Sequence, residues 1–188
     1  MKKLALFSLC VSSLCFGNES LELLISPEDI KEKIQQTAKK LDAEYDNEEV
    51  TVVMVMKGAV CLAADLIREL HVPAALEYMK ASSYGGRMDR GELKITGIDH
   101  LDLNGKNVLV VDDIFDSGAT MEGVLAKLQE KNPKSLKSLV LLMKNVPHAT
   151  TYRPDYVLFE IEDRFVIGYG LDFNEYYRGL PGVYAFKN

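Results

Sequence analysis

The chain has 188 residues, of which 47% are hydrophobic and 27% charged, and its formal net charge of -6 gives a sequence pI near 5.2. This length fits one domain whose core needs neither disulfides nor a structural metal. The acidic balance argues against a general nucleic-acid surface, which would carry a basic face, so no nucleic-acid partner is expected. Anionic ligands must then be bound locally, by turns and single cations.

The N-terminal segment, residues 1–20, differs from the rest of the chain. Lys2 and Lys3 precede an apolar run over residues 4–16, which has the length of a signal peptide rather than of a membrane span. Three accounts stay open: an export signal, an uncleaved extension, or a start codon assigned too far upstream, with the protein beginning near Leu21. We treat residues 21–188 as a single domain and expect no membrane association.

A helix is expected directly after Ser26. Ser26 is a suitable N-cap, Pro27 suits the first helical position and Asp29 lies three residues after the cap. Apolar residues then recur on one face, at Ile30, Ile34, Leu41 and Tyr45. The pattern predicts an amphipathic first helix.

A strand, a turn and a second helix follow. Residues 50–56 are continuously apolar and predict a buried strand, residues 58–70 predict a helix, and residues 75–80 predict another strand. Between the first strand and the helix, the amides of Lys57 and Gly58 can face an anion. Taken alone, such a pair is more often an ordinary turn.

The next segment, residues 81–91, is too polar and too rich in glycine to be core, so we expect a surface loop. Residues 92–98 alternate between polar and apolar side chains like a half-exposed strand.

Acids and a small polar turn come together in the next run. Residues 107–111 predict a buried strand that ends at Asp112 and Asp113, and residues 119–131 predict a helix. The turn between them has the small and hydroxyl-bearing residues of a phosphate site, namely Ser117, Gly118 and Thr120. Carboxylates repel phosphate unless a sugar diol or a divalent cation lies over them. A phosphorylated sugar with Mg²⁺ satisfies both halves of the run.

Two further strands, residues 136–143 and 156–161, complete the pattern, and Lys144 ends the first of them. Apolar strands that alternate with helices imply an α/β fold with a parallel sheet and right-handed crossovers. We expect a small appendage built from the N-terminal helix region and the aromatic C-terminal part. A ligand cleft would lie between it and the carboxyl edge of the sheet.

Residues 108–120 read V-L-V-V-D-D-I-F-D-S-G-A-T and closely resemble the 5-phosphoribosyl-1-pyrophosphate (PRPP) signature of the type I phosphoribosyltransferases. Residues 162–181 read E-D-R-F-V-I-G-Y-G-L-D-F-N-E-Y-Y-R-G-L-P and resemble the purine-binding and C-terminal stretch of the hypoxanthine-guanine branch. The resemblance covers nearly all of residues 21–187. It implies a parallel twisted sheet flanked by helices, with a small hood subdomain. The family often has Glu-Asp where this chain has Asp112-Asp113.

The resemblance also implies an activity. Such enzymes salvage purines by transferring 5-phosphoribosyl from PRPP to N9 of a 6-oxopurine, so that hypoxanthine or guanine becomes IMP or GMP and pyrophosphate is released. Mg²⁺ is the implied cofactor, and a homo-oligomer, a dimer or tetramer, is expected. Because PRPP is an intracellular metabolite, we expect a cytoplasmic location.

The site residues implied by the resemblance fall into five groups. PRPP and the nucleotide are assigned to Lys57, Gly58, Asp112, Asp113, Asp116, Ser117, Gly118, Ala119, Thr120 and Arg178. The purine is assigned to Lys144, Phe165, Val166 and Asp172. Metal is assigned to Asp112, Asp113 and Asp172, with Asp172 holding a second Mg²⁺ through or beside water. Asp116 is the expected general base, while Lys144 donates to the purine O6. Ser83 and Tyr84 are expected on a mobile lid loop.

Two other functions compete with this interpretation. A two-component receiver domain also has a strand ending in two metal-binding acids, but its acids lie on the first strand and it has no role for D-S-G-A-T. A PRPP-sensing regulator shares the fold without catalysis and should show a basic nucleic-acid face. Preference among hypoxanthine, guanine and xanthine stays open.

Overall fold

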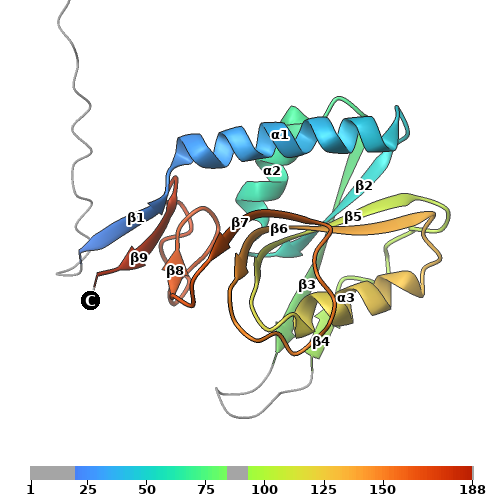
Figure 1. Cartoon of the computed structure of the whole chain (residues 1–188). Coiled ribbons are helices and arrows are strands. Elements are labelled where there is room, and N and C mark those ends of the chain that lie inside the picture. Colours follow the sequence, from blue (N-terminus) through green and yellow to red (C-terminus); the bar gives the residue numbers. More distant parts are fainter. Residues whose placement is uncertain (1–19, 84–92, 188) are drawn as a thin grey trace, which may run out of the picture.

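The structure is a computed structural model that describes residues 20–83 and 93–187 (Figure 1). The strands are β1 (Leu21–Ile25), β2 (Val50–Met56), β3 (Ala74–Ser83), β4 (Leu93–Thr96), β5 (Asn107–Phe115), β6 (Ser135–Lys144), β7 (Tyr156–Ile161), β8 (Val166–Ile167) and β9 (Val183–Phe186). The helices are α1 (Pro27–Tyr45), α2 (Val60–Glu69) and α3 (Ala119–Gln129).

A six-stranded sheet forms the centre of the fold, in the order β4-β3-β2-β5-β6-β7. All neighbours pair in parallel except the edge strand β4, which is antiparallel to β3. α1 and α2 cover one face of this sheet and α3 covers the other (Figure 1). The expected parallel sheet flanked by helices is confirmed.

The apolar strands are buried because helices cover both faces of the sheet. In β2 every residue from Val50 to Val55 is buried, and in β6 the burial is continuous from Ser138 to Met143. The apolar side chains form two clusters, one on each face of the sheet.

The first helix forms as its sequence predicts. The Ser26 side chain accepts a hydrogen bond from the Asp29 N–H at 3.1 Å, and Pro27 occupies the first turn. Asp46, in the left-handed conformation, ends the helix. The expected stripe is buried, at Ile30, Ile34, Leu41 and Tyr45.

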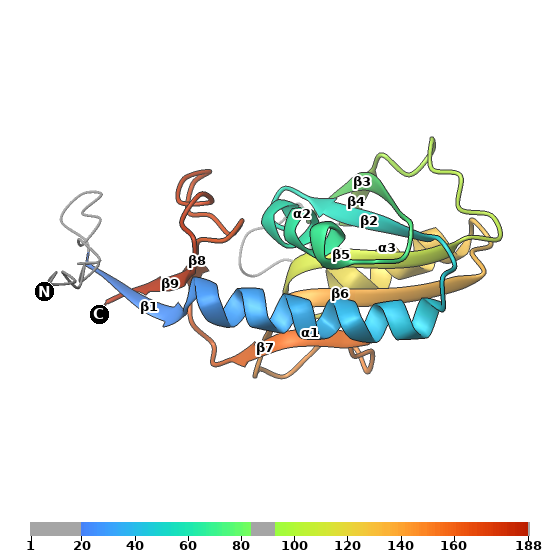
Figure 2. The ribbon, with the colours of Figure 1, turned by 90° about the horizontal axis from the view of Figure 1, so that it is seen from above.

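A second, three-stranded sheet lies beyond the N-terminal end of α1, in the order β1-β9-β8 (Figure 2). β1 and β9 come from opposite ends of the chain and pair antiparallel, with Leu21 opposite Phe186. This sheet is the expected hood. Its strands β1 and β9 were not predicted, because such short strands depend on a distant partner rather than on local pattern.

Several element bounds differ from the sequence prediction. α2 begins at Val60 rather than residue 58, because Lys57 to Ala59 form a turn. β5 continues past residue 111 to Phe115, so the two acids lie inside the strand rather than after it. β4 ends at Thr96, two residues before the expected end.

No helix within residues 20–83 and 93–187 is long and apolar enough to cross a membrane. The signal-like stretch before residue 20 lies outside the described residues.

Candidate functional site

The predicted site residues gather where the strand order reverses. β2 leads through α2 to β3 on one side, whereas β5 leads through α3 to β6 on the other. Loops that leave the carboxyl ends of two such strands diverge and leave a crevice, which is where open α/β sheets bind ligands. The turn after β2 contains Lys57 and Gly58, and the turn after β5 contains Asp116 to Gly118.

The turn after β5 is shaped for an anion. Asp116, Ser117 and Ala119 are exposed, and Gly118 has a φ of 84°, a conformation that side chains disfavour. α3 then begins without a side-chain N-cap, so its positive end and the backbone N–H groups of its first turn are available to a phosphate. The Ser117 hydroxyl accepts only a long hydrogen bond, 3.5 Å, from the Ala119 N–H.

The space around Gly118 also excludes a side chain at this position. A Cβ at this position would lie 2.4 Å from Thr150 Cγ2 and 2.7 Å from Phe115 Cζ. The turn is therefore packed against the loop between β6 and β7, and its shape is fixed by tertiary contacts.

Asp112 and Asp113 form a buried acid pair. Asp112 is 7% exposed, and its Oδ1 accepts the Asp113 N–H at 2.9 Å. Burial raises the pKa of Asp112 well above its ordinary value, and the neighbouring Asp113 carboxylate raises it further. Burial also raises the pKa of Asp113. Both carboxyls would be stabilised by a ligand that brings hydroxyl donors or positive charge.

Gly58 brings the turn after β2 against this acid pair. The Met56–Lys57 peptide bond, at the start of this turn, is cis. A Cβ on Gly58 would lie 1.6 Å from Asp113 Oδ2, and a Cβ on Gly170 would lie 1.9 Å from the Gly58 carbonyl oxygen. Three distant chain segments thus meet here at a closeness that only glycine permits.

Lys57 and Arg178 are joined by a carboxylate that the sequence did not single out. Glu175 Oε2 lies 2.8 Å from Lys57 Nζ and 3.2 Å from the Arg178 guanidinium. The hydrogen bond from Lys57 lowers the pKa of Glu175, and the hydrogen bond from Arg178 lowers it further. Arg178 also pairs with Asp172 at 2.8 Å and donates to the Gly170 carbonyl at 2.7 Å. This basic pair is therefore close enough to share one anion.

Lys144 emerges from the end of β6 next to the proposed base. Its Nζ lies 3.7 Å from Asp116 Oδ2 and 2.9 Å from Asp163 Oδ1. The Lys144 side chain is 13% exposed, whereas that of Asp116 is 59% exposed. The structure thus brings the two predicted catalytic residues together, one at the end of each neighbouring strand.

Phe165 and Val166 occupy the hood. Phe165 is 53% exposed and packs against Phe173, with ring centroids 5.7 Å apart, and against Phe186 at 6.4 Å. Val166 pairs with Ala185 in the hood sheet. An exposed aromatic face of this kind suits stacking on a planar base.

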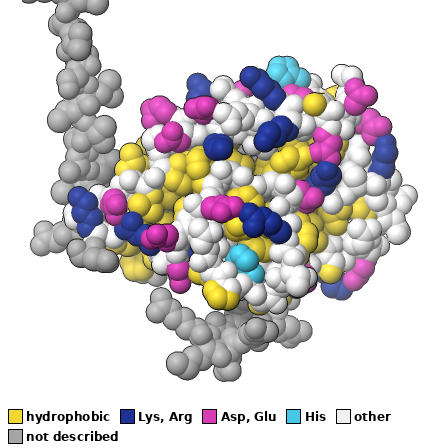
Figure 3. Space-filling model, in the orientation of Figure 1, with side chains coloured by type: hydrophobic (Ala, Val, Ile, Leu, Met, Phe, Trp, Pro, Cys, Tyr) yellow, Lys and Arg dark blue, Asp and Glu magenta, His cyan; other side chains and the backbone are white. Residues whose placement is uncertain are grey.

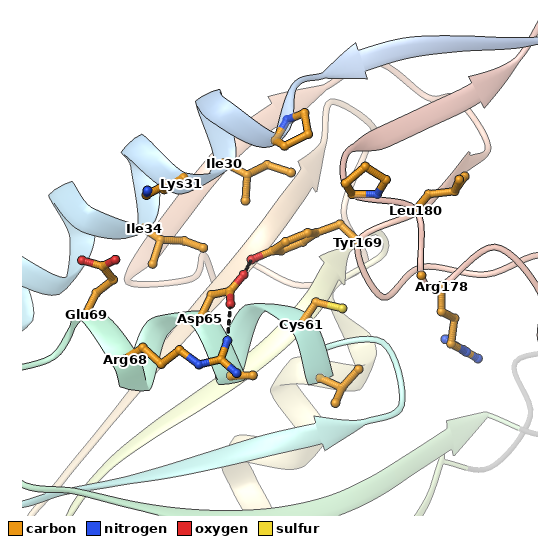
Figure 4. A pocket seen from close by; sticks show the side chains of 15 residues that line it. Ile30, Lys31, Ile34, Cys61, Asp65, Arg68, Glu69, Tyr169, Arg178 and Leu180 are labelled. Carbon is orange, nitrogen blue, oxygen red and sulfur yellow. Dashed lines mark hydrogen bonds and ion pairs between the residues drawn. The ribbon is translucent and has the colours of Figure 1, made fainter. Parts of the chain in front are cut away.

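A cavity of about 580 Å³ lies between α1, α2 and the hood (Figure 4). Among the predicted site residues that the structure describes, Arg178 alone lines this cavity. Inside it, the Tyr169 hydroxyl donates to Asp65 Oδ2 at 2.6 Å, and Asp65 also pairs with Arg68 at 2.7 Å (Figure 4). Burial raises the pKa of Tyr169 well above its ordinary value. The Tyr169–Asp65 bond ties the hood to α2.

The residues assigned to metal come from two parts of the chain. Among the described residues, no group of three or more acidic, histidine or cysteine side chains could hold a metal ion. Asp172, which the resemblance assigns to a second Mg²⁺, pairs with Arg178 and accepts the Glu175 N–H at 2.8 Å. The acid pair alone still fits Mg²⁺, which commonly takes one or two carboxylates and completes its shell with water and substrate phosphates.

The expected lid residues, Ser83 and Tyr84, lie at the edge of the described residues and remain a prediction. Ser83 is the last residue of β3, and Tyr84 lies outside the described residues.

Sequence reasoning missed four residues that the structure places at the site: Gly170, Glu175, Asp163 and His148. The acids lie within the stretch that resembles the purine-binding segment, where Glu175 stands three residues before Arg178. Charge spacing alone could have suggested that pair. Nothing in the local pattern marks His148, whose contact with the turn crosses 32 positions of sequence.

Comparison with known proteins shows the family to which the chain belongs. A model described as "Phosphoribosyl transferase domain" matches residues 24–174. Hypoxanthine-guanine phosphoribosyltransferase from Aquifex aeolicus is 42% identical over 172 residues, which span 90% of this chain and 97% of the relative. The chain belongs to the hypoxanthine-guanine phosphoribosyltransferase family.

Other members of the family agree in sequence and in structure. The Homo sapiens hypoxanthine-guanine phosphoribosyltransferase is 36% identical over 176 residues, 88% of this chain and 81% of the relative. A crystal structure of the Bacillus anthracis hypoxanthine-guanine phosphoribosyltransferase superposes with a TM-score of 0.83 at 36% identity, over 87% of this chain and 97% of that one. The likeness to the hypoxanthine-guanine phosphoribosyltransferase fold therefore extends over most of the chain.

Proposed function

We propose that this chain transfers the 5-phosphoribosyl group of PRPP to N9 of hypoxanthine or guanine and releases pyrophosphate, as a purine salvage enzyme. The observation that carries the proposal is the pairing of Asp116 with Lys144, 3.7 Å apart, directly at the phosphate-binding turn. The cytoplasm, where PRPP is found, is the proposed location. A homo-oligomer is also proposed; for the similar Trypanosoma cruzi hypoxanthine phosphoribosyl transferase, the C-terminal region has a role in oligomeric state and enzymatic activity.

Binding of PRPP divides between the two turns and the acid pair. The backbone of Gly118 to Thr120 and the Ser117 hydroxyl would hold the 5′-phosphate. Asp112 and Asp113 would accept the ribose hydroxyls or ligate Mg²⁺. Lys57, the Gly58 amide and Arg178 would hold the pyrophosphate, once Glu175 releases the two cations. Asp172 would hold a second Mg²⁺, directly or through water, once it releases Arg178.

The purine would lie between the hood and the end of β6. Phe165 would stack on the base and the Val166 carbonyl would accept from its exocyclic edge. Lys144 would donate to O6, which selects 6-oxopurines over adenine, whose 6-amino group is itself a donor.

The reaction requires one bond to form and one to break. The purine N9 attacks C1′ of PRPP while the bond from C1′ to the pyrophosphate oxygen breaks, through an oxocarbenium-like transition state. Asp116 accepts or shares the N7 proton as general base, and Lys144 opposes the charge that grows at O6. When bound, Mg²⁺ supplies positive charge that stabilises the leaving pyrophosphate.

The test measures nucleotide formed from PRPP, Mg²⁺ and each of hypoxanthine, guanine, xanthine and adenine, for the full chain and for Asp116→Asn. We expect turnover of 6-oxopurines but not of adenine, and a kcat about a hundredfold lower in the variant, the usual scale for general-base loss. Asp99→Asn, an exposed carboxyl remote from the turn, should leave kcat unchanged.

A PRPP-sensing regulator is the competing function. On the face shown in Figure 3, basic side chains of the described residues are interspersed with acidic ones rather than gathered in one patch. PRPP binding without turnover of any base would favour the regulator and contradict the enzyme.

A further inference from the structure

His148 lies on the loop between β6 and β7 and contacts the turn that contains the proposed base. Its Nδ1 lies 2.6 Å from the Asp116 carbonyl oxygen, and the N–H of the next residue, Ala149, donates to the Ser117 carbonyl at 2.8 Å. Because a carbonyl oxygen only accepts, His148 Nδ1 must carry the proton of this hydrogen bond. The loop thus makes two successive hydrogen bonds to the backbone of the turn.

The imidazole ring is held in place by an aromatic neighbour. It meets the Phe115 ring edge-on, with centroids 5.0 Å apart and planes at 65°. Phe115 is only 1% exposed, so it forms a fixed wall rather than a mobile contact. Beyond the histidine, the Thr150 hydroxyl donates to Glu122 on α3 at 2.8 Å. The loop is anchored to both β5 and α3, on either side of the turn.

We propose that His148 is a positioning residue for catalysis, which fixes the backbone at Asp116 so that the exposed carboxylate is held beside Lys144. The inference rests on the proposed function, in which Asp116 is the base. The Asp116 side chain is 59% exposed and its ion pair with Lys144 is long, at 3.7 Å, so its own contacts restrain it weakly. Backbone restraint therefore carries more of the positioning, and a displacement of about 1 Å at a reacting group can lower a rate up to a hundredfold.

Two substitutions separate the hydrogen bond from the ring contact. His148→Phe keeps an aromatic ring against Phe115 but removes the donor, whereas His148→Asn keeps a donor near the place of Nδ1 but removes the ring. We expect kcat about tenfold lower in His148→Phe, within the range for misplacement of a base, with less than a twofold change in the KM for PRPP. His148→Asn should recover most of kcat, although it should have the lower melting temperature.

The two variants should therefore rank in opposite order by kcat and by melting temperature. His100 also meets an aromatic ring, Tyr78, at 6.3 Å on another part of the surface, and its Phe and Asn variants should keep wild-type kcat. A purely structural role predicts that kcat falls in step with melting temperature, with His148→Asn the worse variant. That result, or wild-type kcat in His148→Phe, would overturn the inference.

The double variant Asp116→Asn/His148→Phe tests whether His148 acts on kcat through Asp116. If His148 acts through Asp116, adding His148→Phe to Asp116→Asn should lower kcat no further. Independent, multiplicative losses would contradict the proposal. Absence of turnover in the unsubstituted chain would overturn the proposed function and this inference together, whereas turnover insensitive to His148→Phe overturns the inference alone.

Discussion

The buried carboxyls of Asp112 and Asp113 lower the stability of the fold and favour the binding of a ligand. Two carboxyls buried side by side destabilise the ionised fold, and each unit by which folding raises a pKa corresponds to about 1.4 kcal/mol. Gly58 packs against Asp113, and a Cβ at Gly58 would overlap the carboxylate. The acids are therefore enclosed by protein on this side. A ligand that carries hydroxyls or a divalent cation relieves the repulsion, so the unfavourable charge favours binding.

The raised pKa of Asp112 gives a pH-dependent prediction for Asp112→Asn. A carboxyl whose pKa is raised by folding contributes stability below its unfolded pKa, about 3.9, and that contribution is lost as the pH rises through the folded pKa. The amide does not titrate. The free energy of unfolding of the variant, relative to that of wild type, should therefore be higher at pH 7.5 than at pH 4.5. Urea unfolding at both pH values measures this difference.

Asp102→Asn, which removes an exposed carboxyl, is the control for this comparison and should show no such gain. The explanation fails if Asp112→Asn is less stable than wild type by the same amount at both pH values. The variant should also bind Mg²⁺ and PRPP more weakly, because one carboxylate is lost.

At the scale of elements, the site is assembled by loops that reach across from the hood. The Tyr169–Asp65 bond fixes the hood to α2 (Figure 4). The next residue, Gly170, lies so close to the Gly58 carbonyl that a Cβ would overlap the oxygen. Arg178 donates to the Gly170 carbonyl and pairs with Glu175. The turn after β2 and the hood loop are thus joined at several points without a regular element between them.

Glu175→Gln tests the electrostatics of this junction. The Glu175 carboxylate pairs with Lys57 and Arg178, the two cations proposed to hold pyrophosphate, so its removal should strengthen product inhibition. Exposed ion pairs are weak, which sets the expected decrease in the pyrophosphate inhibition constant at about twofold to fivefold. Initial-rate measurements at several pyrophosphate concentrations give this constant.

Glu162→Gln provides the matched control, since Glu162 is an exposed acid before β8, and it should leave pyrophosphate inhibition unchanged. Weaker inhibition in Glu175→Gln would show instead that Glu175 holds the cations in a favourable arrangement.

The whole molecule consists of two sheets whose relative position determines the cleft. The residues proposed to bind phosphate and ribose come from the central sheet and its turns, whereas Phe165, Val166 and Arg178 come from the hood. A ligand that contacts both stabilises the fold by mass action.

Removal of magnesium should show this linkage. With PRPP at a hundred times its Kd the stabilisation is about 2.7 kcal/mol, which corresponds to a melting temperature roughly 5 to 10 °C higher for a chain of this size. EDTA should abolish most of the shift if Mg²⁺ bridges PRPP to the acid pair. Magnesium alone, without PRPP, is the control and should shift the melting temperature little. An equal shift in EDTA would exclude a bridging metal.

Much of the fold was predictable because its signals are local. The cap at Ser26 and the apolar runs of β2 and β6 each depend on neighbours in sequence. The same locality explains what was missed. Whether Glu175 neutralises Lys57 depends on a contact across 118 positions, and β1 becomes a strand only because β9 lies beside it.

The sequence by itself determined the family, the α/β class and the chemistry available, because residue types and their short spacing set which groups can bind phosphate, sugar or purine. Tertiary structure alone decided which charges meet. It buried Asp112, paired Arg178 with Asp172, and brought His148 to the Asp116 carbonyl. Such contacts depend on the packing of distant segments, and electrostatic and hydrogen-bond energies depend on distance and burial, which no local pattern specifies.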